Sequence, residues 1–492
     1  MSLINVSNLT FAYEGSYNNV FENVSFQIDT DWKLGFTGRN GRGKTTFLNL
    51  LMSKYEYNGT ISSSIDFVYF PFKIENISKN TIDILYDIIF DFELWELLKE
   101  LSLLSVSEDT LYRPFYTLSN GERTKILLAG LFLKENRFLL IDEPTNHLDE
   151  NARKIVSDYL KSKKGFILVS HDREFLDNCI DHILVINKTN IEVQKGNFSS
   201  WWNNKHDKDK SELSENFKLQ KDIKKLSDSA KRTASWSDKV EKSKKQSLKS
   251  GSKADKGYIG HKSAKMMKRS KAIESRQKTA IEEKSKLLKD IEKADSLLIK
   301  PLEYHTNRLV ELKNISVYYN DKIICENINF FIDRGDRIVI KGKNGSGKSS
   351  ILKLINKEKI TFNGEINIGS NLIISYVPQD ISFIKGSLKD FADENKIDES
   401  LFKAILRKLD FSREQFEKDM SDFSEGQKKK VLIAKSLCKK AHLYIWDEPL
   451  NFIDVFSRVQ IENLILEHKP TMLFVEHDAT FINKIATKFE EF

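Results

Sequence analysis

The sequence predicts an α/β protein made of two similar nucleotide-binding halves, joined by a long pair of antiparallel helices. The first observation behind this prediction is an internal repeat, since "GFTGRNGRGKTTFLNLL" at 35–51 returns as "VIKGKNGSGKSSILKLI" at 339–355. The second is that three further motifs recur in both halves, in the same order and at similar spacing. The third is a basic segment between the halves that contains no proline and can therefore form long helices.

Charge divides the chain into three parts. The 492 residues carry a net charge of +7, but residues 203–300 alone hold 28 Lys+Arg and 15 Asp+Glu. The rest of the chain is therefore mildly acidic, and this asymmetry indicates a polyanionic partner for the middle segment. We expect a first nucleotide-binding domain at 1–202, a helical-hairpin linker at 203–300 with its tip near 239–265, and a second domain at 301–492.

Apolar residues in the middle segment recur at helical spacing. Met266, Ile273, Ala280, Leu287 and Ala294 follow one another at every seventh position. This spacing is typical of a helix that packs along a seam against another helix. The Gly- and Ser-bearing stretch at 247–260 predicts the turn between the two helices.

Each glycine-rich stretch follows an apolar strand and opens a helix, an arrangement that binds phosphate through backbone N–H groups. The candidate residues are Gly38, Asn40, Gly41, Gly43, Lys44, Thr45 and Thr46 in the first half, and Gly342, Asn344, Gly345, Gly347, Lys348, Ser349 and Ser350 in the second. The two lysines are expected to reach the outer phosphates of ATP, and the hydroxyl groups of Thr45 and Ser349 to bind Mg²⁺.

Paired carboxylates end the strands "FLLIDE" and "LYIWDE", where a parallel sheet has its ligand crevice. Asp142 and Asp447 are expected to support the Mg²⁺ shell, while Glu143 and Glu448 polarise the water that attacks ATP. A later apolar strand in each half is followed by a histidine that is expected to approach the γ-phosphate: His171 and His477. The sequence therefore predicts an ATPase with two sites for ATP and Mg²⁺.

The stretches "LSNGE" and "FSEGQ" resemble the signature sequence of ABC-type ATPases. In that family the signature of one half completes the nucleotide site of the other half. The resemblance implies that Ser424 and Gly426 complete site one, which contains Lys44. It also implies that Ser119 and Gly121 complete site two, which contains Lys348.

The resemblance also covers the adenine pocket and the metal-sensing loop. Tyr13 and Tyr319 match the aromatic residue that stacks on adenine, with simple packing along the strand as the alternative. Gln379 in "YVPQD" matches the glutamine that senses Mg²⁺ and phosphate, whereas Phe72 stands at that place in the first half. Phenylalanine cannot coordinate a metal. We therefore expect site one either to hydrolyse ATP more slowly or to respond differently to nucleotide.

Two ATPase domains joined by a basic hairpin resemble the ABC-F group of translation proteins. Motifs such as "RPFYTLSNGE", "GNFSSW" and "AKMMKRSK" are similar to its antibiotic-resistance (ribosome protection) subgroup of the Lsa and Vga type. This resemblance implies a cytoplasmic monomer that binds the E site of the bacterial 70S ribosome, with 23S rRNA and the P-site tRNA as partners of the linker. It also implies that the linker tip displaces lincosamides, pleuromutilins and streptogramin A from the peptidyl-transferase centre.

Basic residues are concentrated at the predicted tip, where residues 239–271 hold 12 Lys+Arg against 2 acidic residues. Aromatic and soft apolar side chains among these cations suit stacking on bases and contact with phosphates. The candidate RNA contacts are Tyr258, His261, Lys262, Lys265, Met266, Lys268 and Arg269. The alternative is that the tip is a solvated, inert spacer.

Other functions compete with ribosome protection. A housekeeping ABC-F factor that acts on the P-site tRNA is the main alternative, although the 46 positions from Phe72 to Leu118 leave no room for the extra arm of many such factors. A transporter ATPase is a weaker alternative, since it would need a membrane partner and no run approaches the ~20 apolar residues of a membrane span. A DNA-repair ATPase is also weaker, since it would have far longer coiled coils. The three cysteines, Cys179, Cys325 and Cys438, are far apart and fit a reducing cytoplasm. We expect neither a membrane nor a DNA partner.

Overall fold

The computed structural model has an α/β fold in which the same elements recur in both halves. It describes residues 2–15, 19–90, 92–134, 137–146, 148–187, 190–246, 297–319 and 322–492, together with 265, 268, 271–273, 275, 276 and 279; within 190–246, side chains are described as far as residue 229. Met1–Trp201 and Ala294–Phe492 form one compact unit that contains both halves, and Trp202–Lys293 form a second unit.

A six-stranded sheet forms the centre of the first half. In spatial order its strands are β5 (Asp66–Phe70), β6 (Arg137–Asp142), β7 (Phe166–Val169), β3 (Lys33–Gly38), β8 (His182–Ile186) and β9 (Ile191–Lys195). All neighbours are parallel except β8 and β9. A separate antiparallel sheet consists of β2 (Phe21–Asp29), β1 (Leu3–Phe11) and β4 (Asn58–Ser62).

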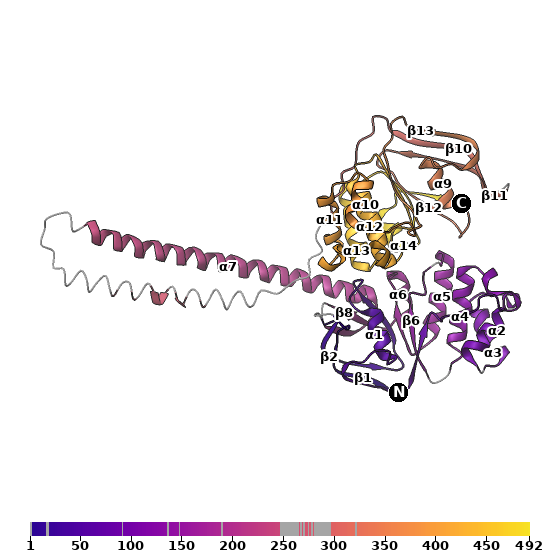
Figure 1. Cartoon of the computed structure of the whole chain (residues 1–492), viewed down its shortest axis with the longest axis horizontal. Coiled ribbons are helices and arrows are strands. Elements are labelled where there is room, and N and C mark those ends of the chain that lie inside the picture. Colours follow the sequence, from indigo (N-terminus) through magenta and orange to yellow (C-terminus); the bar gives the residue numbers. More distant parts are fainter. Residues whose placement is uncertain are drawn as a thin grey trace. The chain divides into compact units, whose positions relative to one another are not determined.

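The second half repeats this arrangement with five central strands. These strands, all parallel, are β14 (Ile374–Val377), β15 (Leu443–Asp447), β16 (Met472–Val475), β12 (Arg337–Lys341) and β17 (Lys488–Glu491). The antiparallel sheet consists of β11 (Lys322–Asp333), β10 (Arg308–Tyr319) and β13 (Thr361–Ile368). In Figure 1 these three strands lie apart from the helices between residues 388 and 485 of the second half.

The helices also recur in pairs. Those of the first half are α1 (Lys44–Leu51), α2 (Thr81–Ile89), α3 (Leu94–Leu103), α4 (Asn120–Leu131), α5 (Glu150–Ser162) and α6 (Arg173–Cys179), with 3₁₀ turns η1 (Glu108–Tyr112) and η2 (Phe115–Thr117). Those of the second half are α9 (Lys348–Ile355), α10 (Leu388–Glu394), α11 (Glu399–Lys408), α12 (Glu425–Cys438), α13 (Val455–His468) and α14 (Ala479–Ile485), with η3 (Arg413–Phe416) and η4 (Met420–Asp422).

The central strands are short apolar runs because a parallel sheet covered on both faces buries nearly every side chain. All four residues of β7, "FILV", and all five of β15, "LYIWD", are buried. Each such leucine, isoleucine or phenylalanine contributes about 1.5–3 kcal/mol when it leaves water. The charged residues Asp142 and Asp447 stand at the carboxyl ends of β6 and β15, so the core itself determines where the catalytic groups emerge.

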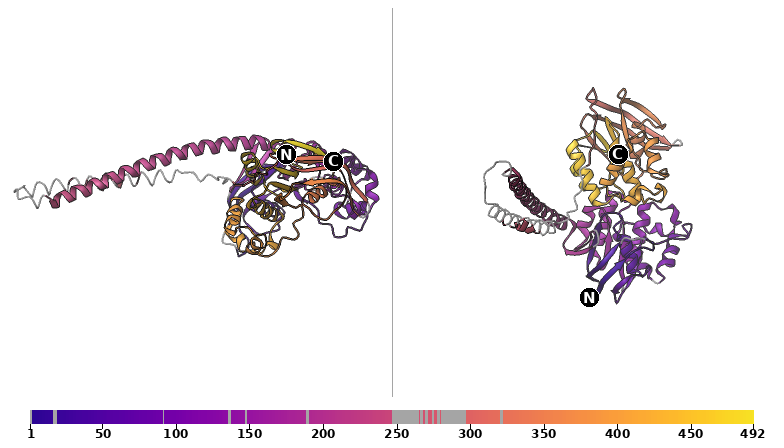
Figure 2. Two further views of the ribbon diagram at one scale, coloured as in Figure 1. Left: turned by 90° about the horizontal axis from the view of Figure 1, so that it is seen from above. Right: turned by 60° about the vertical axis from the view of Figure 1, so that its left-hand side comes forward.

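The segment after β9 is a single helix of 49 residues, α7 (Phe198–Gln246), which Figure 2 shows without a break. At ~1.5 Å per residue this helix is roughly 70 Å long. Phe198 and Trp201 in its first turn are buried, with ring centroids 5.4 Å apart. The described residues from 265 to 279 are also helical, but the predicted turn lies outside the described residues. Within the described ranges, none of the helices combines the length and the apolar composition that crossing a bilayer requires.

Substitution of two glycines would show how tightly the antiparallel sheet of the second half is packed. Gly364 has φ +108°, and a Cβ at that position would lie 2.4 Å from the backbone oxygen of Asn314. Gly335 has φ +85°, but its Cβ would meet no atom within 4 Å. We expect Gly364→Ala to lower the free energy of unfolding by about 3 kcal/mol and Gly335→Ala by about 1 kcal/mol. Chemical denaturation of the full chain measures both, and equal losses would show that strand β10 yields to the added methyl group.

Candidate active sites

The glycine-rich loops lead directly into α1 and α9. At Gly41 (φ +80°) and Gly345 (φ +84°) no atom lies within 4 Å of where a Cβ would stand, so a bulky anion can approach the backbone there. The Nζ of Lys44 donates to the carbonyl oxygen of the first loop glycine at 2.8 Å, and Lys348 makes the same bond at 2.8 Å. The helices start after two further glycines with φ +93°, Gly43 and Gly347. Both loops therefore fit a phosphate chain.

Each loop also places a hydroxyl group beside a carboxylate. Thr45 Oγ1 donates to Asp142 Oδ2 at 3.2 Å, and Ser349 Oγ donates to Asp447 Oδ1 at 3.2 Å. The other oxygen of Asp447 is buried without a hydrogen-bond partner in the described part of the chain. Mg²⁺ prefers oxygen ligands and usually takes one or two from the protein, with waters and substrate phosphates as the rest. Each hydroxyl–carboxylate pair fits this requirement, and no group of three or more His, Cys, Asp or Glu side chains that could hold a metal occurs among the described residues.

The second carboxylate of each pair sits on strained backbone. Glu143 has φ +51° and Glu448 has φ +47°, a left-handed conformation that costs energy and is found at functional sites. Glu143 Oε1 lies 3.4 Å from His171 Nε2, and Glu448 Oε1 lies 3.5 Å from His477 Nε2. The turn therefore directs each glutamate toward the histidine that follows a later strand.

The two glutamates differ in their surroundings although their motifs match. Burial, followed by the charge of Asp142, raises the pKa of Glu143 to about 8. Burial alone would also raise the pKa of Glu448, but hydrogen bonds from His477 and Gln379 outweigh it, and the net pKa of Glu448 is lowered. A group that is ionised near neutral pH is the better general base. The surroundings of Glu448 thus favour its ionised form, which can accept a proton from water.

The metal-sensing loop contributes to this difference, after the contact with His477. Gln379 Nε2 donates to Glu448 Oε2 at 2.8 Å, so this glutamine holds the glutamate in place. Phe72, its counterpart, packs edge-on against Phe70 with centroids 6.3 Å apart, and Lys134 Nζ lies 5.6 Å from its ring. An aromatic ring in this setting has no donor to offer the first site.

A tyrosine that the sequence motifs did not indicate contacts the metal-supporting carboxylate of site one. Tyr69 OH donates to Asp142 Oδ2 at 3.0 Å. Its counterpart is Tyr376, whose buried hydroxyl has no hydrogen-bond partner in the part of the chain that the structure describes. The signal was present, since both halves have tyrosine three residues before Phe72 and Gln379 in "YFPF" and "YVPQ". Parallel pairing of β5 with β6 places Tyr69 level with the end of the neighbouring strand.

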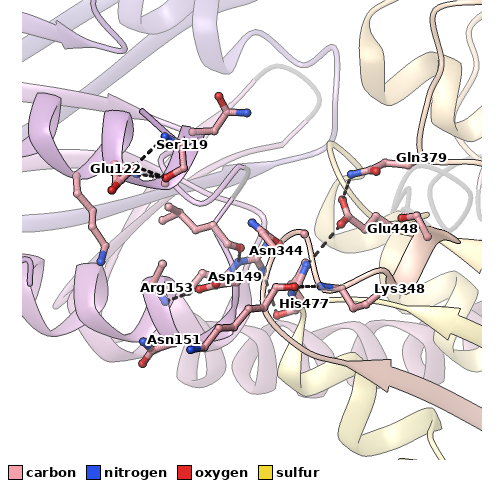
Figure 3. Close-up of a pocket in the computed structure, with 18 of the residues that line it drawn as sticks. Ser119, Glu122, Asp149, Asn151, Arg153, Asn344, Lys348, Gln379, Glu448 and His477 are labelled. Carbon is pink, nitrogen blue, oxygen red and sulfur yellow. Dashed lines mark hydrogen bonds and ion pairs between the residues drawn. The ribbon is translucent and has the colours of Figure 1, made fainter. Parts of the chain in front are cut away.

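A large pocket contains most of the residues predicted for site two. It has a volume of about 1080 Å³ and joins the signature of the first half to the loop of the second (Figure 3). The predicted residues that line it are Ser119, Gly121, Tyr319, Asn344, Gly345, Gly347, Lys348, Ser349, Ser350, Gln379, Glu448 and His477. This arrangement brings together the two halves of the site that the sequence resemblance paired.

The signature serines begin helices. Ser119 Oγ accepts from Glu122 N at 3.2 Å while Glu122 Oε2 accepts from Ser119 N at 2.8 Å, a reciprocal cap at the start of α4. Ser424 and Gln427 form the same capping box at the start of α12. The partial positive charge of each helix N-terminus is therefore available to a phosphate group.

Site one is closed by direct contacts between the halves. Asn40 Nδ2 donates to the carbonyl oxygen of Phe452 at 2.7 Å, and a Cβ at Gly426 would lie 2.9 Å from that same Nδ2. Arg39 and Arg42 each place a guanidinium nitrogen 3.7 Å from a carboxylate oxygen of Asp410. The first loop and the second signature are thus in direct contact.

The two tyrosines proposed for adenine have different environments. Tyr319 lines the site-two pocket and is 45 % exposed. Tyr13 shares a 2.6 Å hydrogen bond with Thr46 Oγ1 and packs edge-on against Phe11, with ring centroids 5.0 Å apart. Stacking on adenine remains a proposal for both, and the contacts of Tyr13 also fit the alternative of strand packing.

The predicted RNA contacts lie almost entirely outside the described residues. This applies to Tyr258, His261, Lys262, Met266 and Arg269. The two remaining residues, Lys265 and Lys268, are helical and exposed.

Comparison with known proteins places the chain among nucleotide-binding domains. The family model described as "ABC transporter" matches twice, at residues 21–146 and 325–451. The archaeal ribosome recycling factor aABCE1, solved in complex with the ribosomal stalk protein aP1, superposes with a TM-score of 0.62 at 19 % identity, over 98 % of this chain and 86 % of that one. This likeness confirms the predicted fold of two tandem ATPase domains.

Several curated relatives match along nearly the whole chain. ATP-binding protein Uup of Buchnera aphidicola subsp. Acyrthosiphon pisum (strain APS) is 29 % identical over 99 % of this chain and 80 % of its own length. Ribosome protection protein VmlR of Bacillus subtilis (strain 168) is 28 % identical over 98 % of this chain and 85 % of its own. ABC transporter F family member 2 of Arabidopsis thaliana is 25 % identical over 99 % and 76 %, respectively.

Replacing both Glu143 and Glu448 by glutamine keeps the shape of each side chain and removes its basicity. We expect ATP turnover to fall by about 10²–10⁴-fold, the usual contribution of a general base. ATP should still bind, since neither glutamate belongs to the phosphate loop. Phosphate release and nucleotide binding measured on the same preparation check this, and turnover at the parental rate would refute the assignment.

The single substitutions should not be equivalent. Because Gln379 supports Glu448 while Phe72 offers nothing to Glu143, we expect Glu448→Gln to remove more of the ATPase rate than Glu143→Gln. Gln379→Leu should slow turnover in the Glu143→Gln background, where site two works alone. Steady-state kinetics of the variants compare these rates. Equal rate losses in Glu143→Gln and Glu448→Gln would show that Phe72 does not affect ATP hydrolysis.

Proposed function

Because the chain belongs to the ABC transporter family and is an ATPase with two ATP sites, we propose that it is a ribosome-protection factor of the ABC-F group. It binds the E site of the bacterial 70S ribosome as a monomer, in contact with 23S rRNA. Its linker tip reaches toward the P-site tRNA and dislodges lincosamides, pleuromutilins and streptogramin A. The antibiotic-resistance subgroup of the Lsa and Vga type is the subgroup that this proposal assigns.

The catalytic part of the proposal follows from the two sites. Lys44 and Lys348 bind the outer phosphates, and the backbone of each loop wraps the phosphate chain. Mg²⁺, held by Thr45 with Asp142 and by Ser349 with Asp447, would neutralise charge on the phosphate oxygens. Glu143 and Glu448 orient the attacking water, and the neighbouring histidines, His171 and His477, face the γ-phosphate.

One observation carries the ribosomal part of the proposal: a basic helix of 49 residues follows the first of two ATPase domains, in a chain that matches a ribosome protection protein over 98 % of its length. Residues 198–246 hold 13 Lys+Arg and 8 Asp+Glu. A helix that binds along a membrane surface or within a protein core would need an apolar face, whereas a polar, basic helix suits a polyanion. Ribosomal RNA and tRNA are both polyanions, and a long basic hairpin could contact them at the same time.

The housekeeping alternative has its own support. Uup is as similar to the chain as VmlR is, and its name does not mention ribosome protection. A housekeeping factor would bind ribosomes and hydrolyse ATP equally well. Rescue of drug-inhibited translation is therefore the property that separates the two functions.

Replacing residues 250–262 by a short Gly-Ser turn tests the tip. We expect folding and basal ATPase activity to be retained, since both cores lie outside this segment. Protection of a translation reaction inhibited by a lincosamide or a pleuromutilin should be lost. In vitro translation with added drug measures this, and full rescue by the shortened protein would make the tip a spacer and favour the housekeeping function.

Charge at the tip gives a second measurement. Neutralising Lys262, Lys265, Lys268 and Arg269 should weaken ribosome association and flatten its salt dependence, because each lost phosphate contact lowers the slope of log K against log salt by about 0.7–0.9. The matched control neutralises four residues of α7 far from the tip, Lys218, Lys221, Lys224 and Lys225. Ribosome pelleting at several salt concentrations compares the two. An equal effect of both variants would mean that charge acts without regard to position.

A further inference from the structure

A buried cluster of charged side chains connects the catalytic loop of site two to the first half of the chain. Arg173, at the start of α6, reaches Glu462 on α13 in the second half. Its two terminal nitrogens pair with both carboxylate oxygens of Glu462, and the longer contact measures 3.3 Å. The same guanidinium lies 3.7 Å from Asp478. Arg173 is 6 % exposed, Glu462 2 % and Asp478 1 %, so solvent hardly screens these charges.

Asp478 directly follows the second catalytic histidine, His477, in the chain. Its Oδ1 accepts from the backbone N–H of Phe481 at 2.9 Å, which caps the start of α14. Its Oδ2 accepts from Arg458 at 2.9 Å. The position of this carboxylate is therefore fixed by one arginine from its own half and one from the other half.

A second arginine of the first half touches the same loop. Arg153 donates from NH1 to the carbonyl oxygen of His477 at 3.2 Å. The same nitrogen donates to Asp172 Oδ2 at 2.9 Å, next to the histidine of site one. The first half thus contacts the second catalytic loop at the backbone of His477 and at the side chain of Asp478.

The internal repeat shows that the Arg173–Glu462 pair has no mirror image. Arg173 corresponds to Ala479, which follows Asp478 in the second half, and Glu462 corresponds to Ser157 on α5. Alanine carries no charge, and the buried Ser157 hydroxyl has no hydrogen-bond partner in the described part of the chain. A pair of this kind can therefore form in one direction only.

We propose that Arg173 is a positioning residue for ATP hydrolysis at site two, acting through Glu462 and Asp478. The first half thereby acts on the second catalytic loop through a buried ion pair that has no counterpart in the opposite direction. Loss of the guanidinium leaves two buried carboxylates poorly compensated, so the loop must shift. A small displacement of a catalytic group is enough to lower a rate substantially. The inference concerns ATP turnover alone and rests on the proposed roles of Glu143 and Glu448, not on the ribosome as target.

The experiment isolates each site in the full chain. In the Glu143→Gln background turnover reports site two, and in the Glu448→Gln background it reports site one. Adding Arg173→Ala should lower kcat at site two by about 10- to 100-fold with little change in KM for ATP, and kcat at site one by less than about twofold. This is the opposite of what sequence proximity suggests, since Arg173 stands two residues after His171.

Two further variants separate positioning from general destabilisation. Lys484 also contacts Glu462, at 3.2 Å, but its side chain is half exposed, and an exposed ion pair contributes little. Lys484→Ala should leave both sites unchanged. Arg173→Lys keeps the charge but loses the bidentate fork, and should give a smaller defect confined to site two. If Arg173→Ala fails to fold, the kcat values of Arg173→Lys at the two sites test the proposal instead.

Equal losses of kcat at both sites, a loss confined to site one, or an unchanged site two would each overturn the proposal. A rise in KM without a fall in kcat would do the same, since it would assign Arg173 to nucleotide binding. The Glu143→Gln, Glu448→Gln double variant is the reference. If it still hydrolyses ATP, the assignment of the bases fails, whatever Arg173 does.

Discussion

Two adjacent carboxylates at the buried end of a parallel strand are the constraint on which both sites depend. Removed from water, such groups need donors or cations close by, or they take up protons. In this chain the donors come from a hydroxyl on the phosphate loop, a histidine after a later strand and, in site two, a glutamine. The strands, loops and helices around the sites can be understood as the supports that bring these groups to one place.

The two halves show how far identical motifs can diverge in their chemistry. Each site has its lysine, aspartate, glutamate and histidine, yet Glu143 and Glu448 have pKa values shifted in opposite directions. Burial and the charge of Asp142 dominate at Glu143, whereas at Glu448 the contacts of His477 and Gln379 outweigh burial. The contacts between the halves also differ. Arg173 forms an ion pair with Glu462, whereas its counterpart Ala479 has no charge with which to form one.

Much of the fold and of the two sites was predictable, because glycine loops, strand-end carboxylates and apolar runs are local patterns with a single physical purpose. The roles of Glu143 and Glu448 followed from their place after a buried strand, but their left-handed backbone did not, since no motif encodes φ. Tyr69 was missed because its contact depends on how β5 pairs with β6. Arg173 and Glu462 lie 289 positions apart, and only the assembled halves bring them together.

The lysines of the phosphate loops carry one more consequence. Lys44 and Lys348 donate to backbone oxygens of their own loops, so their ammonium groups are already solvated by the protein. A phosphate that recruits such a lysine exchanges one acceptor for another and gains only the difference between them. The free energy gained when ATP binds is therefore smaller than a lysine without such acceptors would contribute. A moderate affinity suits an ATPase, because the enzyme must release its nucleotide in every catalytic cycle.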